Sequence, residues 1–274
     1  MAGSAASRLR GHAWRLLALV LVCTVALQLF FAARIALMAV VDPQSTSFQR
    51  SEILRLLADT HRLDWAQDWV DDERIAAHLK RAVIASEDAG FAEHSGVEWD
   101  ALQAAWQKNQ RAEAAAERRN AQQEARQKAQ EARAAQRGTT PPPAPAKPAA
   151  VPKIVGGSTI SQQLAKNLFL SGERTALRKA QEFALTFMLE GLLGKRRILA
   201  IYLNNVEWGE GVFGAQAAAR HYFRVDAAQL APGQAARLAV MLPAPKRFEK
   251  TPGSPYVAGR AATITARMGA VALP

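Results

Sequence analysis

The feature that most constrains this chain is an uncharged apolar run near its N-terminus. Residues 16–33 read LLALVLVCTVALQLFFAA and contain no charged side chain. A helix of this length approaches the ~30 Å hydrocarbon thickness of a bilayer. Arg34 interrupts the run, but residues 35–41 continue it, and a long arginine near a helix end can extend its charge to the interface. We therefore predict a transmembrane anchor over residues 16–41.

Three arginines before this run, Arg8, Arg10 and Arg15, predict its orientation. Because basic residues collect on the cytoplasmic side of membrane spans, residues 1–15 are expected in the cytoplasm and residues after about 42 on the far side. The alternative is a cleaved signal peptide, but its apolar part would span about 7 to 15 residues, and no strong A-x-A site follows the run. The run is apolar on every face, which argues against a core helix of a soluble protein.

The net charge of the chain limits the classes of molecule that it can bind. A formal net charge of +11 implies an anionic partner: nucleic acid, a phosphate-bearing substrate or an acidic lipid surface. The predicted anchor puts the basic domain outside the cytoplasm, which argues against nucleic acid. The single cysteine, Cys23, lies in the apolar run and excludes a disulfide framework and a cysteine-based metal site.

Hydrophobic spacing predicts a mainly helical domain over residues 42–274, since almost no stretch alternates with a period of two. One helix is expected to begin near Asp71 or Asp72, either of which suits an N-cap. It would bury a stripe formed by Ile75, Leu79, Ala82 and Val83. Further helices are expected after the glycines at 156 and 157 and over residues 175–193, 196–203, 213–221 and 232–242.

Residues 108–153 form an insertion of unusual composition. Its first part is rich in helix formers but has no large apolar residue to bury, and its second part, TTPPPAPAKPAAVPK, is a Pro/Ala linker. We interpret this segment as a disordered or solvated insertion. An arm that binds a partner protein is the alternative.

Two clusters of side chains are candidates for chemistry. Glu87 and Asp88 lie where a helix ends at a glycine-containing turn, and repulsion within the pair, together with a partly apolar setting, raises a carboxyl pKa. Such a carboxylate suits the removal of a proton from a sugar hydroxyl, although a solvated helix end is the ordinary explanation of the pair.

The second cluster is cationic. Arg178 and Glu182 are spaced four residues apart on one helix face, with Lys179 beside them and Lys166 and Arg174 upstream. Arginine forks and lysine ammonium groups neutralise a diphosphate. The ordinary explanation is a surface helix with one ion pair. Ser158 lacks a G-x-S-x-G elbow, and His94 and His221 are too few for a metal site, so we predict no metal ligands in the protein.

Taken in order, five segments resemble the motifs of the family-51 glycosyltransferases, which are peptidoglycan glycosyltransferases. Glu87, Asp88, Phe91, His94 and Gly96 match the first, E-D-x-x-F-x-x-H-x-G. GGSTISQQLAKN, residues 156–167, matches the second, and R-K-x-x-E matches Arg178, Lys179 and Glu182. The fourth matches Lys195, Ile198, Leu199, Tyr202, Leu203 and Asn204, and the fifth matches residues 221–223 and 236–238. The chain resembles the monofunctional biosynthetic transglycosylases of this family most closely.

The resemblance implies a lysozyme-like helical domain with a small jaw lobe, anchored in the cell inner membrane with its catalytic domain in the periplasm. It implies polymerisation of lipid II into β-1,4-linked glycan with release of polyprenyl diphosphate and inversion at C1. Glu87 would be the general base, and Glu182 would assist at the diphosphate or help to hold a divalent ion there. The substrate-binding residues implied by the motifs are Asp88, Phe91, His94, Ser158, Thr159, Gln162, Gln163, Lys166, Asn167, Arg174, Arg178 and Lys179.

The resemblance also implies a divalent cation, Mg²⁺ or Mn²⁺, held at the diphosphate mainly by the substrate, and partners among other proteins of wall synthesis or division. Ala200 and Gln234 depart from the family, which often has glutamate at both positions. Two alternatives remain open. A lysozyme-like hydrolase shares the scaffold but does not need the cations, and an inactive anchored scaffold would not need Glu87.

Overall fold

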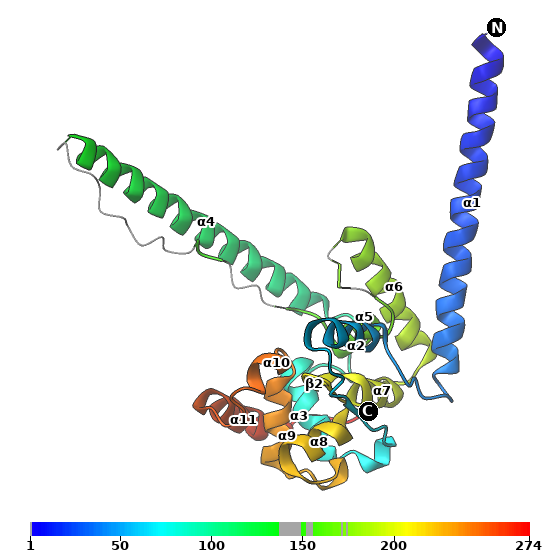
Figure 1. Ribbon diagram of the computed structural model, residues 1–274. Helices are drawn as coiled ribbons and strands as arrows, with labels where there is room; N and C mark the ends of the chain where they lie inside the picture. Colours follow the sequence, from blue (N-terminus) through cyan, green and yellow to red (C-terminus); the bar gives the residue numbers. More distant parts are fainter. Residues whose placement is uncertain (1, 137–148, 152–155, 171, 174) are drawn as a thin grey trace. The chain divides into compact units, whose positions relative to one another are not determined.

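The computed structural model describes residues 2–136, 149–151, 156–170, 172–173 and 175–274. These residues form two compact units. The first comprises residues 1–97 and 159–274, and the second comprises residues 98–158. Helices make up most of both units (Figure 1), which confirms the expected mainly helical fold.

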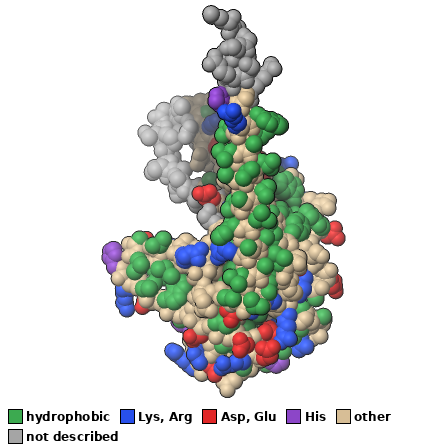
Figure 2. Space-filling model, turned by 90° about the vertical axis from the view of Figure 1, so that its right-hand side faces the viewer, with side chains coloured by type: hydrophobic (Ala, Val, Ile, Leu, Met, Phe, Trp, Pro, Cys, Tyr) green, Lys and Arg blue, Asp and Glu red, His purple; other side chains and the backbone are tan. Residues whose placement is uncertain are grey.

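The chain begins with one long helix, α1 (Ala2–Leu37). Its segment Gly11–Leu37 is long and apolar enough to cross a membrane, with a mean hydropathy of 2.6. Large apolar side chains along it, such as Leu21, Val22 and Leu29, are about two-thirds exposed. Figure 2 shows these hydrophobic side chains as a continuous surface along the helix. Exposure of this extent is unfavourable in water and agrees with the predicted anchor.

Three helices of the first unit, α3 (Ala77–Glu87), α9 (Pro232–Met241) and α11 (Pro255–Met268), pack closely against one another within one hydrophobic core that also contains side chains of other helices. The helix expected from Asp71 or Asp72 starts later than the sequence predicts. A 3₁₀ turn, η1 (Asp72–Arg74), comes first, and the backbone is then extended at Ile75. The reason is tertiary: the backbone N–H of Ala76 donates to the carbonyl of Ala227 in η2 (Ala227–Gln229), which interrupts a continuous helix.

A second group of helices shares this core and contacts the anchor helix. Helix α5 (Ile160–Phe169) packs against α2 (Ser47–Thr60), α6 (Ala176–Leu192) and α7 (Lys195–Asn205), and α1 packs against α6. The positions of α6 and α7, and of α8 (Ala215–Phe223) and α9, confirm the expected helices within a few residues.

A small sheet of three short strands completes the unit: β1 (Ala66–Gln67), β2 (Glu207–Gly209) and β3 (Val212–Phe213). Strand β3 is central, parallel to β1 and antiparallel to β2, with Ala66 opposite Val212. The β2–β3 turn contains Gly211 at φ +71°, where a side chain would collide with the carbonyl of Asp64.

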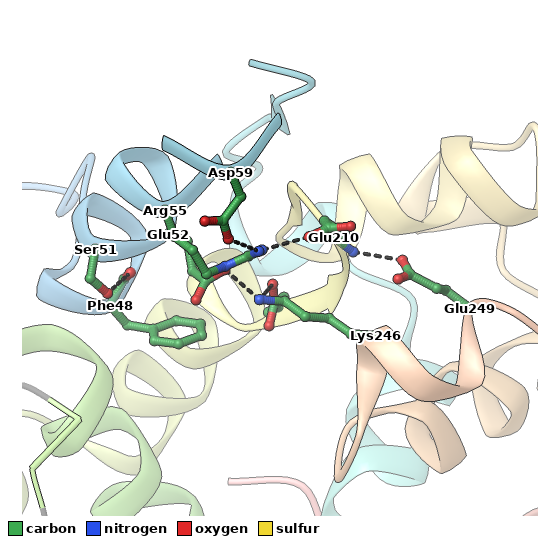
Figure 3. Close-up of polar contacts among 9 residues, drawn as sticks. Phe48, Ser51, Glu52, Arg55, Asp59, Glu210, Lys246 and Glu249 are labelled. Carbon is green, nitrogen blue, oxygen red and sulfur yellow. Dashed lines mark hydrogen bonds and ion pairs between the residues drawn. The ribbon is translucent and has the colours of Figure 1, made fainter. Parts of the chain in front are cut away.

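An ionic network holds the β2–β3 hairpin to α2 and to the short helix α10 (Pro245–Phe248) (Figure 3). Lys246 pairs with Glu52 and lies 3.4 Å from a carboxylate oxygen of Glu207. Arg55 bridges Glu52 and Glu210, at 2.9 and 2.6 Å. This network fixes the hairpin against two helices that are distant in sequence.

The second unit is dominated by α4 (Trp99–Gln136). Residues 108–136 of the expected insertion continue this helix with mostly exposed side chains. They are therefore solvated but helical, because alanine and long charged residues favour a helix without needing a buried face. Asn120 holds the returning chain through two hydrogen bonds with the backbone of Ala150. The rest of the proline-rich part, residues 137–148 and 152–155, lies outside the described residues.

Candidate active site

Asp88 connects the end of α3 to the start of α5. Its carboxylate is buried, and its Oδ2 accepts a hydrogen bond of 2.9 Å from the backbone N–H of Ile160, the first residue of α5. The first N–H groups of a helix have no partner within the helix, and its dipole favours an anion there. Asp88 therefore fixes the end of α3 against the N-terminus of α5.

The second oxygen of Asp88 binds His94. Nε2 of His94 lies 2.8 Å from Oδ1 of Asp88, while the backbone N–H of Gly96 donates to Nδ1 at 3.1 Å. Since Nδ1 accepts, the neutral ring carries its proton on Nε2 and donates it to Asp88. Gly96 has φ +88°, and an added Cβ would lie 2.8 Å from side-chain carbons of Thr186 and Glu190. The glycine of the first motif thus allows a turn that no larger residue could form here.

Glu87 is held by an amide on α5. Nε2 of Gln163 donates to Oε2 of Glu87 at 3.1 Å, and the hydroxyl of Tyr202 donates to Oε1 of Gln163 at 2.9 Å. Burial raises the pKa of Glu87 above its usual value, Asp88 raises this pKa further through charge repulsion, and the hydrogen bond from Gln163 opposes the rise. The carboxyl group is thus oriented and more basic than an exposed glutamate.

The cationic cluster is built on α6. Glu182 is buried, Arg178 Nη1 lies 3.1 Å from its Oε2, and Lys179 pairs with its Oε1. Both cations thus share one carboxylate, which leaves the cluster with a net positive charge. Desolvation lowers the pKa of Lys166, although its side chain still reaches solvent; Glu182 raises that pKa, while Arg178 and Lys179 lower it. Lys166 therefore belongs electrostatically to the same cluster.

Helix α5 connects the Glu87 carboxylate with the cationic cluster of α6. Its buried face carries Ile160, Leu164, Ala165 and Leu168, and its opposite face carries Gln163 and Lys166 three residues apart. Residues at this spacing lie on the same side of a helix. Gln163 binds Glu87 at one end, and Lys166 interacts with the charges of Arg178, Lys179 and Glu182 at the other.

Several predicted substrate-binding residues have structural contacts. Phe91 is fully buried in the core, under the ammonium group of Lys195, which lies 4.5 Å from the ring centre. Thr159 and Gln162 form the capping box that begins α5, and the Thr159 hydroxyl also donates to the carbonyl of Gly96 at 2.6 Å. These contacts shape the site, while the predicted binding roles of these residues stay predictions.

The remaining predicted residues have different places. Asn167 is partly buried on α5, directly after Lys166. Ser158 belongs to the second unit and is described apart from the site. Arg174 lies outside the described residues.

The two departures from the family pattern also have structural contexts. Ala200 lines a pocket together with Arg196, Arg197 and Asp72. Gln234 stands at the third position of α9, where its Oε1 accepts from the backbone N–H of Ala231 at 2.9 Å. Glutamine can cap a helix start as glutamate does, so the capping contact is kept although Gln234 replaces the glutamate that the family often has.

Tyr202 belongs to the fourth sequence motif, but the sequence alone predicts no role for it. Its hydroxyl orients Gln163, and its pKa is raised well above the usual value by burial and by the charges of Glu87 and Asp88. The signal available in the sequence was only its place in the fourth motif, since the contact joins positions far apart in the chain.

A mainly helical domain with an oriented basic carboxylate, a cluster of cations around the buried Glu182 and an apolar N-terminal helix has the features of a membrane-associated transferase acting on a substrate with a phosphate leaving group. Comparison with known proteins agrees. Residues 55–137 and 148–269 match the family described as transglycosylase.

Proteins called biosynthetic peptidoglycan transglycosylase are similar over nearly the whole chain. The protein from Bordetella pertussis is 44% identical over 93% of this chain and 91% of its own length. That from Burkholderia pseudomallei is 47% identical over 91% and 82%, and that from Paraburkholderia xenovorans is 45% identical over 94% and 91%. The chain belongs to the transglycosylase family, and its enzyme class is peptidoglycan glycosyltransferase.

Proposed function

We propose that this enzyme polymerises lipid II into β-1,4-linked glycan strands and releases polyprenyl diphosphate with inversion at C1. The observation that carries the proposal is the shared face of α5, which joins the Glu87 carboxylate to the cations around Glu182. A base for an acceptor hydroxyl and a positive site for a departing diphosphate are the two requirements of this reaction.

Glu87 serves as the general base in this proposal. The 4-hydroxyl of the incoming unit attacks C1 of the growing chain, its proton passes to Glu87, and the bond from C1 to the diphosphate oxygen breaks. A base works best when its pKa lies nearer to the working pH, and burial and Asp88 move the pKa of Glu87 in that direction. Gln163 and Tyr202 orient the carboxylate.

The cationic cluster takes the leaving group. Lys166, Arg178 and Lys179 neutralise charge that develops on the diphosphate as the C1–O bond breaks. Glu182 pairs with both cations of α6 and keeps their side chains in place. Its predicted assistance at the diphosphate is therefore indirect.

The described residues do not fit a resident metal ion. No group of three or more His, Cys, Asp or Glu among them could hold one, and both oxygens of Glu182 are already paired with cations. The expected Mg²⁺ or Mn²⁺ would depend on oxygens of the diphosphate, and no step of the proposal passes through it.

We further propose that α1 anchors the enzyme in the cell inner membrane with its N-terminus in the cytoplasm and the catalytic domain in the periplasm. The apolar segment Gly11–Leu37 and the arginines before residue 16 support this orientation. Lipid II, the growing strand and the membrane are then the partners, and other wall-synthesis proteins stay a prediction.

The test is to incubate the detergent-solubilised enzyme with labelled lipid II and to size the products. Long strands are expected, and their absence would favour an inactive scaffold. In a parallel incubation with preformed glycan strands, shortening of the strands would instead favour the hydrolase. Controls without enzyme measure breakdown of either substrate.

A further inference from the structure

The anchor helix contacts the catalytic domain along one face near its C-terminal end. Gln28, Phe31, Ile35 and Met38 recur at helical spacing, and Ile35 and Met38 are buried. The ring of Phe31 meets that of Phe169 edge-on at 5.4 Å. The opposite side of α1 stays apolar and exposed (Figure 2), so the helix has a protein-facing and a lipid-facing side.

Gln28 and Gln181 form a reciprocal pair across this contact. Nε2 of Gln28 donates to Oε1 of Gln181 at 2.8 Å, and Nε2 of Gln181 donates back to Oε1 of Gln28 at 3.1 Å. Gln28 lies within the apolar segment Gly11–Leu37. Amide groups in such surroundings are stable when they pair with each other, and polar pairs between membrane helices fix which residues meet.

Arg197 makes a second attachment at the end of the anchor. Its Nε donates to the carbonyl of Met38 at 2.7 Å, and its Nη2 lies 2.7 Å from a carboxylate oxygen of Asp42. Gln28 and Met38 are roughly 15 Å apart along the helix, at 1.5 Å per residue. Together with the apolar contacts of Phe31 and Ile35 between them, these two attachments set the tilt of the domain against the anchor.

The first attachment, the Gln28–Gln181 pair, is on α6, the helix that carries the cationic cluster. Gln181 directly precedes Glu182 on α6 and follows Arg178 by three residues. Arg34, where charge first interrupts the apolar run, lies roughly 9 Å along α1 from Gln28. Its guanidinium stacks on Phe169 at 5.1 Å. The start of α6 is therefore held against the apolar run of the anchor, and its Leu177 is 82% exposed.

We propose that the Gln28–Gln181 pair is a positioning device that fixes the tilt of α6 against the anchor and so directs the cations of α6 toward the diphosphate of a membrane lipid. Neither glutamine touches the substrate; both act through the tilt of α6. This inference rests on the proposed function, because it assigns the substrate a phosphate group at the membrane surface.

The contact is tested first by disulfide formation in membranes. In a Cys23→Ala background, the pair Gln28→Cys and Gln181→Cys should cross-link on mild oxidation. Leu29→Cys with Gln181→Cys is the matched control, since Leu29 is 64% exposed on another side of α1. Equal cross-linking of both pairs, or none at the first, would overturn the inference.

The role is tested with the double variant Gln28→Leu and Gln181→Leu. Replacing both partners by apolar groups of similar shape leaves no unpaired amide, so the fold and membrane insertion should persist. We expect the KM for lipid II in lipid vesicles to rise at least fivefold with little change in kcat. Activity in detergent micelles, where no bilayer fixes the depth of the substrate, should stay within twofold of wild type.

The outcomes separate this inference from the proposed function. An unchanged KM in vesicles, or an equal loss in vesicles and micelles, would overturn the positioning role while wild-type polymerisation still supports the function. If the wild type makes no polymer in either medium, the proposed function fails, and the positioning role fails with it.

Discussion

Gln163 donates a hydrogen bond to Glu87 while it accepts one from Tyr202, so the amide is held at both ends. The bond to Glu87 stabilises the charged carboxylate and works against the burial that raises its pKa. The basicity of Glu87 is thus set by opposing effects: burial and the charge of Asp88 raise its pKa, while hydrogen bonds from Gln163 and Ser86 lower it.

Gln163→Leu should move the pH dependence of polymerisation. A general base is active when deprotonated, so the rate rises with pH through the pKa of Glu87. Loss of the donor raises this pKa further, and the acid limb of the pH–rate profile should shift to higher pH. Tyr202→Phe keeps the donor and should shift the limb less. If the acid limb of Gln163→Leu does not shift, the hydrogen bond from Gln163 to Glu87 does not control the pH dependence of the rate.

Asp88→Asn should destabilise the fold. The carboxylate accepts from Ile160 N–H and from His94 Nε2, whereas asparagine has one acceptor oxygen. Its amino group would face a donor in either orientation, because Nδ1 of His94 already accepts from Gly96. We expect a loss of about 1–3 kcal/mol in the free energy of unfolding, measured by denaturant titration. Stability equal to that of Glu87→Gln, which keeps these bonds, would contradict this.

Arg178→Glu should weaken the use of substrate by at least roughly tenfold in kcat/KM, since one charge-assisted contact with phosphate contributes about 1.5–3 kcal/mol. Arg260→Glu on the exposed surface of α11 makes the same change in net charge away from the cluster and is the control. Steady-state kinetics with lipid II measure both. Equal losses would mean that overall charge, and not the cluster, attracts the substrate.

Glu207→Gln should make stability less dependent on pH. Burial chiefly raises the pKa of Glu207 from 4.5 to about 7, with Glu52 and Glu249 adding to the rise and Lys246 opposing it. The folded state then binds the proton more tightly than the unfolded chain. This contribution is fully present below about pH 4.5 and is lost as pH rises through 7.

The expected difference is up to about 3 kcal/mol, at 1.36 kcal/mol for each pKa unit. Denaturant titrations at pH 5 and pH 8 should show a smaller fall in stability for Glu207→Gln than for wild type. The same fall in both proteins would assign the pH dependence to other groups.

The sequence predicted those features that local patterns determine. The stripe from Leu79 to Val83 identified α3, and the motifs brought Glu87 and the Arg178–Glu182 turn into one hypothesis before their contacts were visible. The start of α3 was predicted too early because Ala76 pairs with the distant backbone of Ala227, and no local pattern shows such a bond.

Other parts of the site depend on contacts between distant segments. Thr159 and Gln162 fitted a binding motif, yet they also cap α5, a role that follows from the point at which the helix begins. The Gln28–Gln181 pair joins positions 153 residues apart, and glutamine in an apolar run does not reveal its partner. The raised pKa of Glu207 likewise arises from burial that depends on α2 and α10.

The most direct test of the central claim compares wild type and Glu87→Gln in polymerisation of labelled lipid II, with thermal unfolding as the control for folding. The substitution keeps the shape of the side chain and an oxygen that can accept from Gln163, but it removes the base. The account predicts that the rate falls by roughly 10²–10⁴-fold, the range of general-base catalysis, with an unchanged melting temperature. A wild-type rate in Glu87→Gln would contradict the assignment of Glu87 as the base.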